Sequence, residues 1–296
     1  MIKAGIIGGA GYTAGELIRL LVNHSKSEID FVYSTSNAGN KISAIHQDLL
    51  GAIDLKFSDS INPNVDVLFL CLGHGNSKSF LESNQFSAKT RIIDLSNDFR
   101  LNDDKILNDM AFVYGLPELQ KQAIYRSNYI ANPGCFATAI QLALLPLAQN
   151  NLLNDDVHVN AVTGATGAGT SLSETTHFTW RDNNFSHYKA FKHQHLDEIK
   201  ETVVQLQADF DSEILFVPNR GNFSRGIFAT VYTKFEGSLE EARALYESFY
   251  EKAPFTFVLD EEIHLKLERP MAELLLCVDP DKYKKHILQE NGKAVI

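Results

Sequence analysis

Short apolar runs separated by helical patterns organise the first half of the chain. A continuous apolar run such as residues 65–72 predicts a strand that is buried on both faces. Apolar residues at three- and four-residue spacing, for example Leu17, Leu20 and Leu21, predict helices that pack on one face. Strands that alternate with helices are typical of an α/β fold with a doubly wound parallel sheet. The predicted strands are residues 3–7, 29–33, 65–72, 91–95 and 129–131.

The pattern changes at residue 157, where the predicted strands become longer and alternate apolar with polar positions. A helix with an apolar face begins near His195, and Ser238 with Glu241 forms a capping box that predicts a further helix. These features predict a second, α+β domain with an antiparallel or mixed sheet. Its strands are expected at residues 157–162, 213–217 and 226–235.

Length and composition narrow the class of protein. The chain has 296 residues, enough for about two domains, and 44% of them are hydrophobic. It contains no apolar run of about 18 residues, so we expect no membrane span. A net charge of −10 without a basic cluster argues against nucleic acid as a partner. The three cysteines are far apart and form no CxxC motif, so we expect no metal site and a reducing, cytoplasmic setting.

A glycine-rich turn follows the first predicted strand and opens the first predicted helix. The spacing of Gly8, Gly11 and Gly15 departs from the G-x-G-x-x-G pattern, yet strand, turn and helix occur in the order that a dinucleotide site requires. Glycines let the backbone approach a pyrophosphate, and the helix N-terminus stabilises its charge. A tight connection without a ligand is the alternative, and we favour cofactor binding.

Hydroxyl side chains follow the second predicted strand, where an NAD site would be expected to carry a carboxylate for the ribose 2′-hydroxyl. Ser34, Thr35 and Ser36 occupy this place, and Lys41 is nearby. Small donors and a cation suit a 2′-phosphate. The sequence therefore favours NADP over NAD, a simple polar loop being the other interpretation.

Cys135 lies in the segment NPGCFAT, where a Pro-Gly turn opens a helix. The free backbone N–H groups of a helix N-terminus favour negative charge, so a thiol there loses its proton more easily and becomes a nucleophile. Free cysteines are also among the most buried residue types, so a small buried side chain is the alternative interpretation.

Two further residues and one loop carry candidate chemistry. Arg100, in the loop after residues 91–95, is expected to bind phosphate or carboxylate rather than to be a plain surface charge. His193, expected to be exposed before its helix, is either an acid–base partner for the thiol or an ordinary surface histidine. A metal held by His193 and His195 together is a further alternative, but no third ligand is visible in the sequence. The small-residue loop 163–169 either wraps a ligand with backbone N–H groups or is a flexible connection.

The chain resembles the N-acetyl-γ-glutamyl-phosphate reductases, the NADP-dependent enzymes of arginine biosynthesis, and more distantly the aspartate-semialdehyde dehydrogenases. The resemblance covers roughly residues 1–260. It rests on eight motifs that occur in family order: GGAGYTAGEL, STSNAG, DLSNDFR, YGLPEL, NPGCFAT, TGATGAG, HQHLDEI and FVPNRGNFSRG.

This resemblance implies a Rossmann-type NADP-binding domain, residues 1–134, and a catalytic and oligomerisation domain, residues 135–264, in a homodimer or homotetramer. It implies that Cys135 takes the acyl group as a thioester and that His193, oriented by Glu198, is the general acid–base. The implied substrate-binding residues are Arg100, Asn132, His195 and Arg225, with His195 also the alternative acid–base. The implied cofactor-binding residues are Gly8, Gly11, Tyr12, Thr13, Ala14, Ser34, Ser36, Gly73, His74 and Gly167.

The implied reaction is reduction of N-acetyl-γ-glutamyl phosphate to the 5-semialdehyde with release of phosphate. A related acyl phosphate (N-succinylglutamyl, aminoadipyl or aspartyl) and an inactive nucleotide-binding relative are the alternatives. The chain departs from the family at Phe136-Ala137, where an aromatic-proline pair is usual, and at Thr170, where a basic residue is usual. Residues 265–296 do not match the usual C-terminal motif, so we treat them as a divergent segment.

Overall fold

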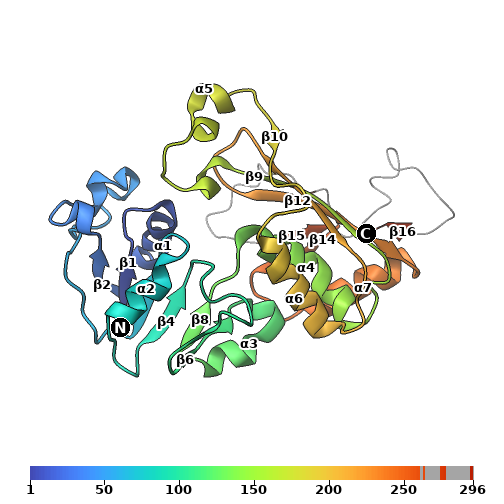
Figure 1. Cartoon of the computed structure of the whole chain (residues 1–296), viewed down its shortest axis with the longest axis horizontal. Helices are drawn as coiled ribbons and strands as arrows, with labels where there is room; N and C mark the ends of the chain where they lie inside the picture. The colour runs from blue at the N-terminus through green and yellow to red at the C-terminus, as the bar shows by residue number, and fades with distance from the viewer. Residues whose placement is uncertain (261–262, 264–273, 278–293, 296) are drawn as a thin grey trace. The chain divides into compact units, whose positions relative to one another are not determined.

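The computed structural model describes residues 1–260, 263, 274–277 and 294–295. The chain forms two compact units, which are coloured mainly blue to green and green to red in Figure 1. The first unit comprises Met1–Leu116, Gln120–Pro133 and Ala168–Ser171. The second comprises Pro117–Leu119, Gly134–Gly167 and the chain from Leu172 onward. The main change of unit falls between Pro133 and Gly134, one residue before Cys135.

The first unit is built on a six-stranded sheet in which every neighbouring pair is parallel. Strand β1 pairs with β2 on one side and β3 on the other, so the chain changes direction across the sheet at β1. A strand order that reverses at this point places ligands at the carboxyl ends of the strands. The order is β2 (Ser27–Tyr33), β1 (Ile2–Ile7), β3 (Val67–Leu70), β4 (Arg91–Asp94), β8 (Tyr129–Ala131), β7 (Val113–Tyr114).

Buried residues cover both faces of this sheet, as expected for a doubly wound fold. Consecutive residues of β1 enter different cores because strand side chains alternate. Ile6 packs with Ile18 of helix α1 (Tyr12–Val22), whereas Ile7 packs with Leu81 of helix α2 (Asn76–Ser83). The predicted α/β class is therefore confirmed. The remaining elements of this half are helix α3 (Pro117–Arg126), the short strands β5 (Ile106–Leu107) and β6 (Met110–Ala111), and the 3₁₀ turns Thr35–Asn37, Ile42–Ala44 and Gln47–Leu49.

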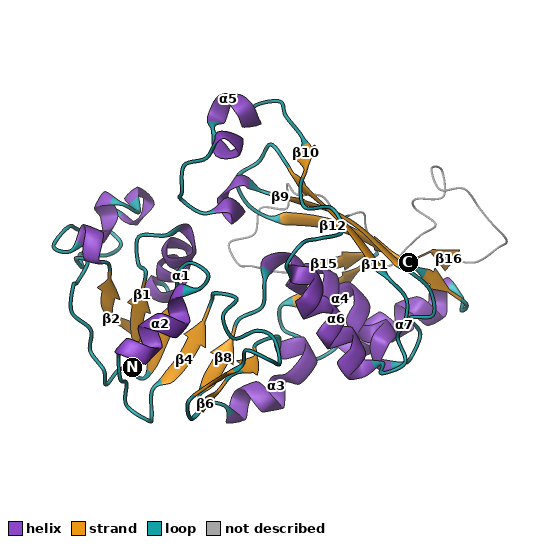
Figure 2. Cartoon of the chain, in the orientation of Figure 1, coloured by secondary structure: helices purple, strands orange, loops and turns teal. Residues whose placement is uncertain are grey.

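The second unit contains a four-stranded mixed sheet, whose long strands lie side by side in Figure 2. The central pair β9 and β11 is parallel, and both outer pairs are antiparallel. The order is β10 (Ser186–His187), β11 (Ile214–Arg220), β9 (Val157–Thr163), β12 (Ile227–Tyr232). The helices are α4 (Cys135–Gln149), α5 (Phe178–Arg181), α6 (His195–Leu206) and α7 (Leu239–Tyr250), and the shorter strands are β13 (Lys234–Phe235), β14 (Thr256–Leu259), β15 (Leu274–Cys277) and β16 (Ala294–Val295).

Helix α4 is the buried centre of this unit, and it packs against both α6 and α7 (Figure 1). It is apolar on nearly all sides, which is typical of a helix enclosed by other elements. Pro146 lies within it and has no N–H to donate to the carbonyl of Leu142, four residues earlier. The hydroxyl of Tyr250 on α7 donates to that carbonyl instead, so the buried acceptor is satisfied.

One sequence prediction of secondary structure differs from the observed elements, and another is confirmed. The strand predicted for residues 226–235 is divided into β12 and β13 at Thr233, whose buried hydroxyl donates to the carbonyl of Asp156 at 3.0 Å. The predicted capping box is present, since Ser238 accepts from the Glu241 N–H and the Glu241 carboxylate accepts from Ser238 N–H. Most of the divergent segment 265–296 lies outside the described residues.

Candidate active site

The glycine turn between β1 and α1 leaves room for a ligand at the helix N-terminus. Gly8 has φ +79°, and a Cβ there would lie 2.5 Å from the carbonyl oxygen of Cys71. Gly11 is the N-cap of α1 and has no side chain to cap it, and the first turn carries no acidic residue. The N–H groups of Tyr12, Thr13 and Ala14 have no acceptor within the helix. These residues fit the diphosphate of a dinucleotide, which is an anion that a helix N-terminus stabilises.

The hydroxyl groups after β2 form a small cluster of hydrogen-bonding side chains. Ser34 Oγ and Ser36 Oγ are 3.5 Å apart, and both accept from Nδ2 of Asn37, at 3.3 and 3.1 Å. Lys41 does not add a spare cation to this cluster, because its ammonium forms an ion pair with Asp54 at 2.7 Å. The hydroxyl donors expected for a 2′-phosphate are therefore gathered together, whereas the cation expected with them already has a partner.

The loops after β3 and β4 are joined by hydrogen bonds. The Asp98 carboxylate accepts from the N–H groups of Gly75 and Lys78, at 2.6 and 3.1 Å, and so caps helix α2. Nδ1 of His74 accepts from the N–H of Asn97 at 3.1 Å. The predicted cofactor residues Gly73 and His74 are both exposed, in a turn that these bonds hold in place.

Arg100 is buried, with 7% of its surface exposed, so it is not the plain surface charge that was the alternative. Its Nε donates to the carbonyl of Asn132 at 2.9 Å, and its Nη2 donates to the carbonyl of Leu95 at 3.1 Å. The structure therefore brings together two of the predicted substrate-binding residues, Arg100 and Asn132.

Cys135 is the first residue of α4 and is exposed to solvent, so it is not the small buried side chain of the alternative interpretation. The preceding N-cap, Gly134, has no side chain. Its N–H donates to Oε2 of the buried Glu198 at 2.9 Å, so a carboxylate from α6 fixes the turn directly before the sulfur. The position suits a thiolate, because the helix N-terminus stabilises negative charge.

His193 and His195 are both buried, each with 6% of its surface exposed. The expectation that His193 lies exposed in a loop is therefore wrong. Its ring packs edge-on against Phe136, Tyr188 and Phe216, with centroids 5.5, 5.6 and 5.4 Å away. The reason is non-local: Phe136 follows Cys135 in α4, and Phe216 belongs to β11. The rings of the two histidines are 4.7 Å apart.

Glu198 lies beside His195. Its Oε1 is 3.8 Å from Nε2 of His195. Nδ1 of His193 accepts from the backbone N–H of His195 at 3.3 Å, and the orientation of His193 by Glu198 stays a prediction. Burial, helped by the nearby charges of His195 and Lys189, lowers the pKa of His193 to about 4. The ring is then neutral at pH 7, and because Nδ1 accepts, its proton is on Nε2.

The sequence predictions did not include Tyr188 and Arg220, which adjoin this cluster. The guanidinium carbon of Arg220 lies 3.8 Å from the centroid of the Tyr188 ring. Burial raises the pKa of Tyr188 to about 12, with a smaller contribution from Cys135, so the phenol stays protonated near that sulfur. Arg220 belongs to the motif FVPNRGNFSRG, but only the pairing of β10 with β11 places it next to Tyr188.

The loop 163–169 is held in place and is not a loose connection. The N–H groups of Ala165 and Thr166 donate to the carbonyls of Phe223 and Ser224, at 2.9 and 3.0 Å. Gly167 in this loop and Arg225 in the facing loop are both exposed. Gly167 belongs to the second unit, whereas the other predicted cofactor residues belong to the first.

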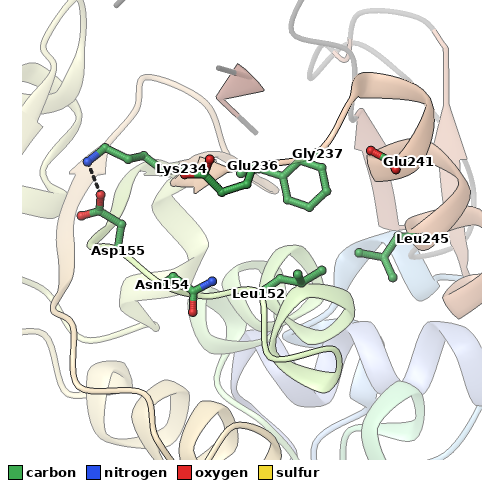
Figure 3. A pocket seen from close by; sticks show the side chains of 9 residues that line it. Leu152, Asn154, Asp155, Lys234, Glu236, Gly237, Glu241 and Leu245 are labelled. Carbon is green, nitrogen blue, oxygen red and sulfur yellow. Dashed lines mark ion pairs between the residues drawn. The ribbon is translucent and has the colours of Figure 1, made fainter. Parts of the chain in front are cut away.

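A cavity of about 450 Å³ in the second unit contains none of the predicted site residues. Figure 3 shows its polar rim, where Lys234 forms an ion pair with Asp155. Among the described residues, no three His, Cys, Asp or Glu side chains gather in a way that could hold a metal ion. Within the same described residues, no helix is long and apolar enough to cross a membrane.

Both halves of the chain match known protein domains. Residues 3–127 match the model "Semialdehyde dehydrogenase, NAD binding domain", and residues 135–286 match "Semialdehyde dehydrogenase, dimerisation domain". An N-acetyl-gamma-glutamyl-phosphate reductase of Christiangramia forsetii is 66% identical over 90% of this chain and 82% of its own length. One of Bacteroides fragilis is 55% identical over the same shares of the two chains.

Solved structures of distant relatives show the same fold. Aspartate semialdehyde dehydrogenase II of Vibrio cholerae, solved with ASA, is 14% identical, with a TM-score of 0.64 over 93% of this chain and 87% of its own. The Candida albicans enzyme, solved with NADP, is 13% identical, with a TM-score of 0.60 over 91% and 86%. The glycine turn, the exposed thiol and both family models agree: the chain is an NAD(P)-dependent oxidoreductase that belongs to the semialdehyde dehydrogenase family, in its N-acetyl-gamma-glutamyl-phosphate reductase group.

Proposed function

We propose that the protein catalyses the NADPH-dependent reduction of N-acetyl-γ-glutamyl phosphate to N-acetylglutamate 5-semialdehyde, with release of phosphate, in arginine biosynthesis. The observation that carries the proposal is the exposed Cys135 at the N-terminus of α4, next to a buried pair of histidines and a carboxylate. The names of the similar proteins, at 55–66% identity, support the choice of substrate.

Cys135 is the proposed nucleophile. Its thiolate attacks the acyl carbon, the bond from that carbon to the phosphate oxygen breaks, and phosphate leaves with the electron pair, so a thioester forms on the sulfur. The bound reduced nicotinamide supplies the hydride that a thioester carbon accepts. Cys135 is then expelled as the carbon–sulfur bond breaks and the aldehyde is released. The N–H groups at the start of α4 stabilise negative charge on sulfur and on the acyl oxygen.

The two histidines are the proposed acid–base groups, with His193 in that role and His195 as the alternative. A neutral His193 with its proton on Nε2 can donate a hydrogen bond to an acyl or phosphate oxygen. Oε1 of Glu198 lies 3.8 Å from Nε2 of His195, which keeps His195 as the alternative acid–base group. Arg100, Asn132 and Arg225 are proposed to bind the substrate's anionic groups.

The proposed cofactor is NADP, held by the residues of the first unit. The first turn of α1 would receive the diphosphate, and the hydroxyl cluster after β2 would receive the 2′-phosphate. No carboxylate stands at residues 34–38, where an NAD site would use one for the ribose. The exposed Gly73 and His74 are proposed as further cofactor contacts, and Gly167 is proposed to complete the site.

The mixed sheet of the second unit is the proposed contact with a second copy of the chain, in a homodimer or homotetramer. Val157, Val159 and Ala161 of β9 are buried, so the residues between them face the other side of the sheet. On that side His158 stacks on Tyr232, which is 41% exposed. A sheet face with partly exposed aromatic groups suits an interface between copies, as the name of the matching family model suggests.

The test is phosphate-dependent reduction of NADP⁺ by purified protein, with the semialdehydes of N-acetylglutamate, N-succinylglutamate, aminoadipate and aspartate. We expect turnover with the N-acetylglutamate compound and a loss of at least about 10³-fold in Cys135→Ser, because serine lacks an ionisable thiol of comparable pKa. A thiol-reactive reagent should label Cys135 much faster than Cys71, whose pKa burial raises to about 12.

The control for folding is nucleotide affinity, which Cys135→Ser should retain. A wild-type protein that binds NADP but turns over none of the four semialdehydes would identify an inactive nucleotide-binding relative. Turnover restricted to the aminoadipate or aspartate compound would assign a different acyl phosphate to the same chemistry.

A further inference from the structure

Two neighbouring arginines, of which Arg220 is close to His193, have no acidic partner among the described residues. Arg181, the last residue of α5, is buried with 8% of its surface exposed, and Arg220 at the end of β11 is half-buried. The carboxylate partners of Arg19 and Arg243 lie elsewhere in the chain, at Glu16, Asp48 and Asp260. Taking a guanidinium out of water without a counter-charge is costly, so this pair is a place where an anion would be stabilised.

Backbone pairing and ring stacking fix the position of Arg220. Strand β10 pairs with β11 so that Ser186 is opposite Arg220, which places Tyr188 diagonally across on the same face. The Tyr188 ring covers one face of the guanidinium at 3.8 Å. Nη2 of Arg181 donates to the carbonyl of Gly221, the residue after Arg220, which holds the second cation beside the first.

This cationic pair adjoins the proposed reaction centre. The Tyr188 ring that carries Arg220 also contacts His193, with centroids 5.6 Å apart, and Tyr188 lies close enough to Cys135 for that sulfur to affect its pKa. The charge of Arg220 lowers the pKa values of both His193 and Arg181, although burial is the larger cause for each. A ligand whose carbonyl carbon lies at Cys135 therefore has the positive charge of Arg220 nearby, on the Tyr188 ring.

We propose that Arg220, stacked on Tyr188 and supported by Arg181, binds a carboxylate of the substrate that takes no part in the reaction. A guanidinium with one face covered by a ring keeps its N–H edge for a bidentate carboxylate. This inference rests on the proposed function. The carboxylate has two sources in that chemistry, the α-carboxylate of the glutamyl group or the far carboxylate of a dicarboxylic N-acyl group such as succinyl.

The reverse reaction tests the proposal, because phosphate and semialdehyde are separate substrates there. In Arg220→Gln we expect the KM for semialdehyde to rise about 10- to 100-fold while the KM for phosphate stays unchanged, which is the effect of losing a charge-assisted pair. Arg220→Lys should recover part of the loss, since it keeps the charge but not the fork. Lys200→Gln, which removes an exposed cation of α6 in the same unit, should change neither constant.

Two substrates separate the sources of the carboxylate. If Arg220 binds the α-carboxylate, Arg220→Gln raises the KM values for N-acetyl- and N-succinylglutamate semialdehyde by the same factor. If it binds the far carboxylate, only the succinyl compound is affected, and the wild type prefers that compound. The concentrations of N-acetylglutamate and N-succinylglutamate that protect Cys135 from a thiol-reactive reagent, in wild type and Arg220→Gln, compare the affinities for the two compounds without turnover.

The results that would overturn the proposal are distinct from a failure of the proposed function. A rise in the KM for phosphate alone would make Arg220 a phosphate ligand, and unchanged constants in an active Arg220→Gln enzyme would show that the pair binds no substrate group. A wild-type protein without turnover on either semialdehyde would instead refute the function itself.

Discussion

Helices α1 and α4 begin in the same way but present different groups at their first residues. Both have a glycine at the N-cap, Gly11 and Gly134, with extended backbone and no side-chain cap. At α1 the N-cap N–H donates back to its own turn, to the carbonyl of Gly8 at 3.3 Å. At α4 the N-cap N–H is held by the Glu198 carboxylate, and the next residue is the exposed Cys135.

The comparison shows that a helix N-terminus supplies only a preference for negative charge. In the turn before α1, residues 8–11 are glycines and one alanine, so an anion from outside can approach the backbone. In α4 the group at the terminus is part of the chain, the sulfur of Cys135, and the Glu198 carboxylate positions the turn before it. The side chains near each terminus therefore decide whether it suits a bound phosphate or a covalent step.

The largest expected effect comes from filling the turn before α1. Gly8→Ala should lower the free energy of unfolding by about 3 kcal/mol, since a residue with φ +79° costs roughly 1–2 kcal/mol and its Cβ would meet the Cys71 carbonyl at 2.5 Å. Nucleotide affinity should fall as well. Denaturant unfolding and nucleotide titration measure the two effects.

Gly51→Ala is the matched control for this variant. Gly51 has φ +81°, but a Cβ there would have no atom within 4 Å, so only the backbone cost of roughly 1–2 kcal/mol remains. Equal costs in the two variants would show that close approach at Gly8 contributes nothing.

A smaller effect is expected from the carboxylate that holds the turn before α4. Glu198→Gln should lower kcat about 10- to 100-fold, because the amide removes the negative charge beside His195 and weakens the bond from Gly134 N–H. Nucleotide affinity at α1 should not change. Glu213→Gln, which removes an exposed carboxylate paired with Lys200, should leave kcat intact. A parallel loss of nucleotide affinity and kcat in Glu198→Gln would mean a general loss of structure.

The smallest expected effect is the contribution of His193, which packs beside α4, to the pH dependence of the free energy of unfolding. Its pKa of about 4 in the folded protein lies below the ordinary 6.5, so between these values the unfolded chain binds more protons. The contribution is complete above pH 6.5 and is lost as the pH falls toward 4, by at most about 3 kcal/mol and by about 1–2 kcal/mol once solvent screening is allowed for. Unfolding of wild type and His193→Gln between pH 4 and 7 measures it, and identical pH slopes would refute it.

Local patterns were sufficient where neighbours in the sequence determine the structure. The glycine turn, the start of α4 at Cys135 and the capping box at Ser238 all depend on residues within one turn of each other. The sequence therefore predicted the doubly wound sheet and the place of Cys135 at the start of a helix. Strand β7, only two residues long, escaped prediction because its pairing with β8 and not its composition defines it.

Contacts between distant segments account for the errors. His193 is buried because Phe136, Tyr188 and Phe216 surround it, and no periodicity in its own segment reports them. Lys41 has a partner in Asp54, 13 residues later, across an irregular loop. Arg220 depends on the register of β10 with β11 in the same way.

The effects of substitutions at Pro146 and Tyr250 depend on each other. Loss of the phenol alone would strand the Leu142 carbonyl in the apolar interior, whereas a residue with its own N–H at position 146 would make the phenol dispensable. Substitutions at these two positions should therefore be compensating rather than independent. The helix that presents the thiol thus depends for its backbone integrity on a side chain contributed more than a hundred residues later.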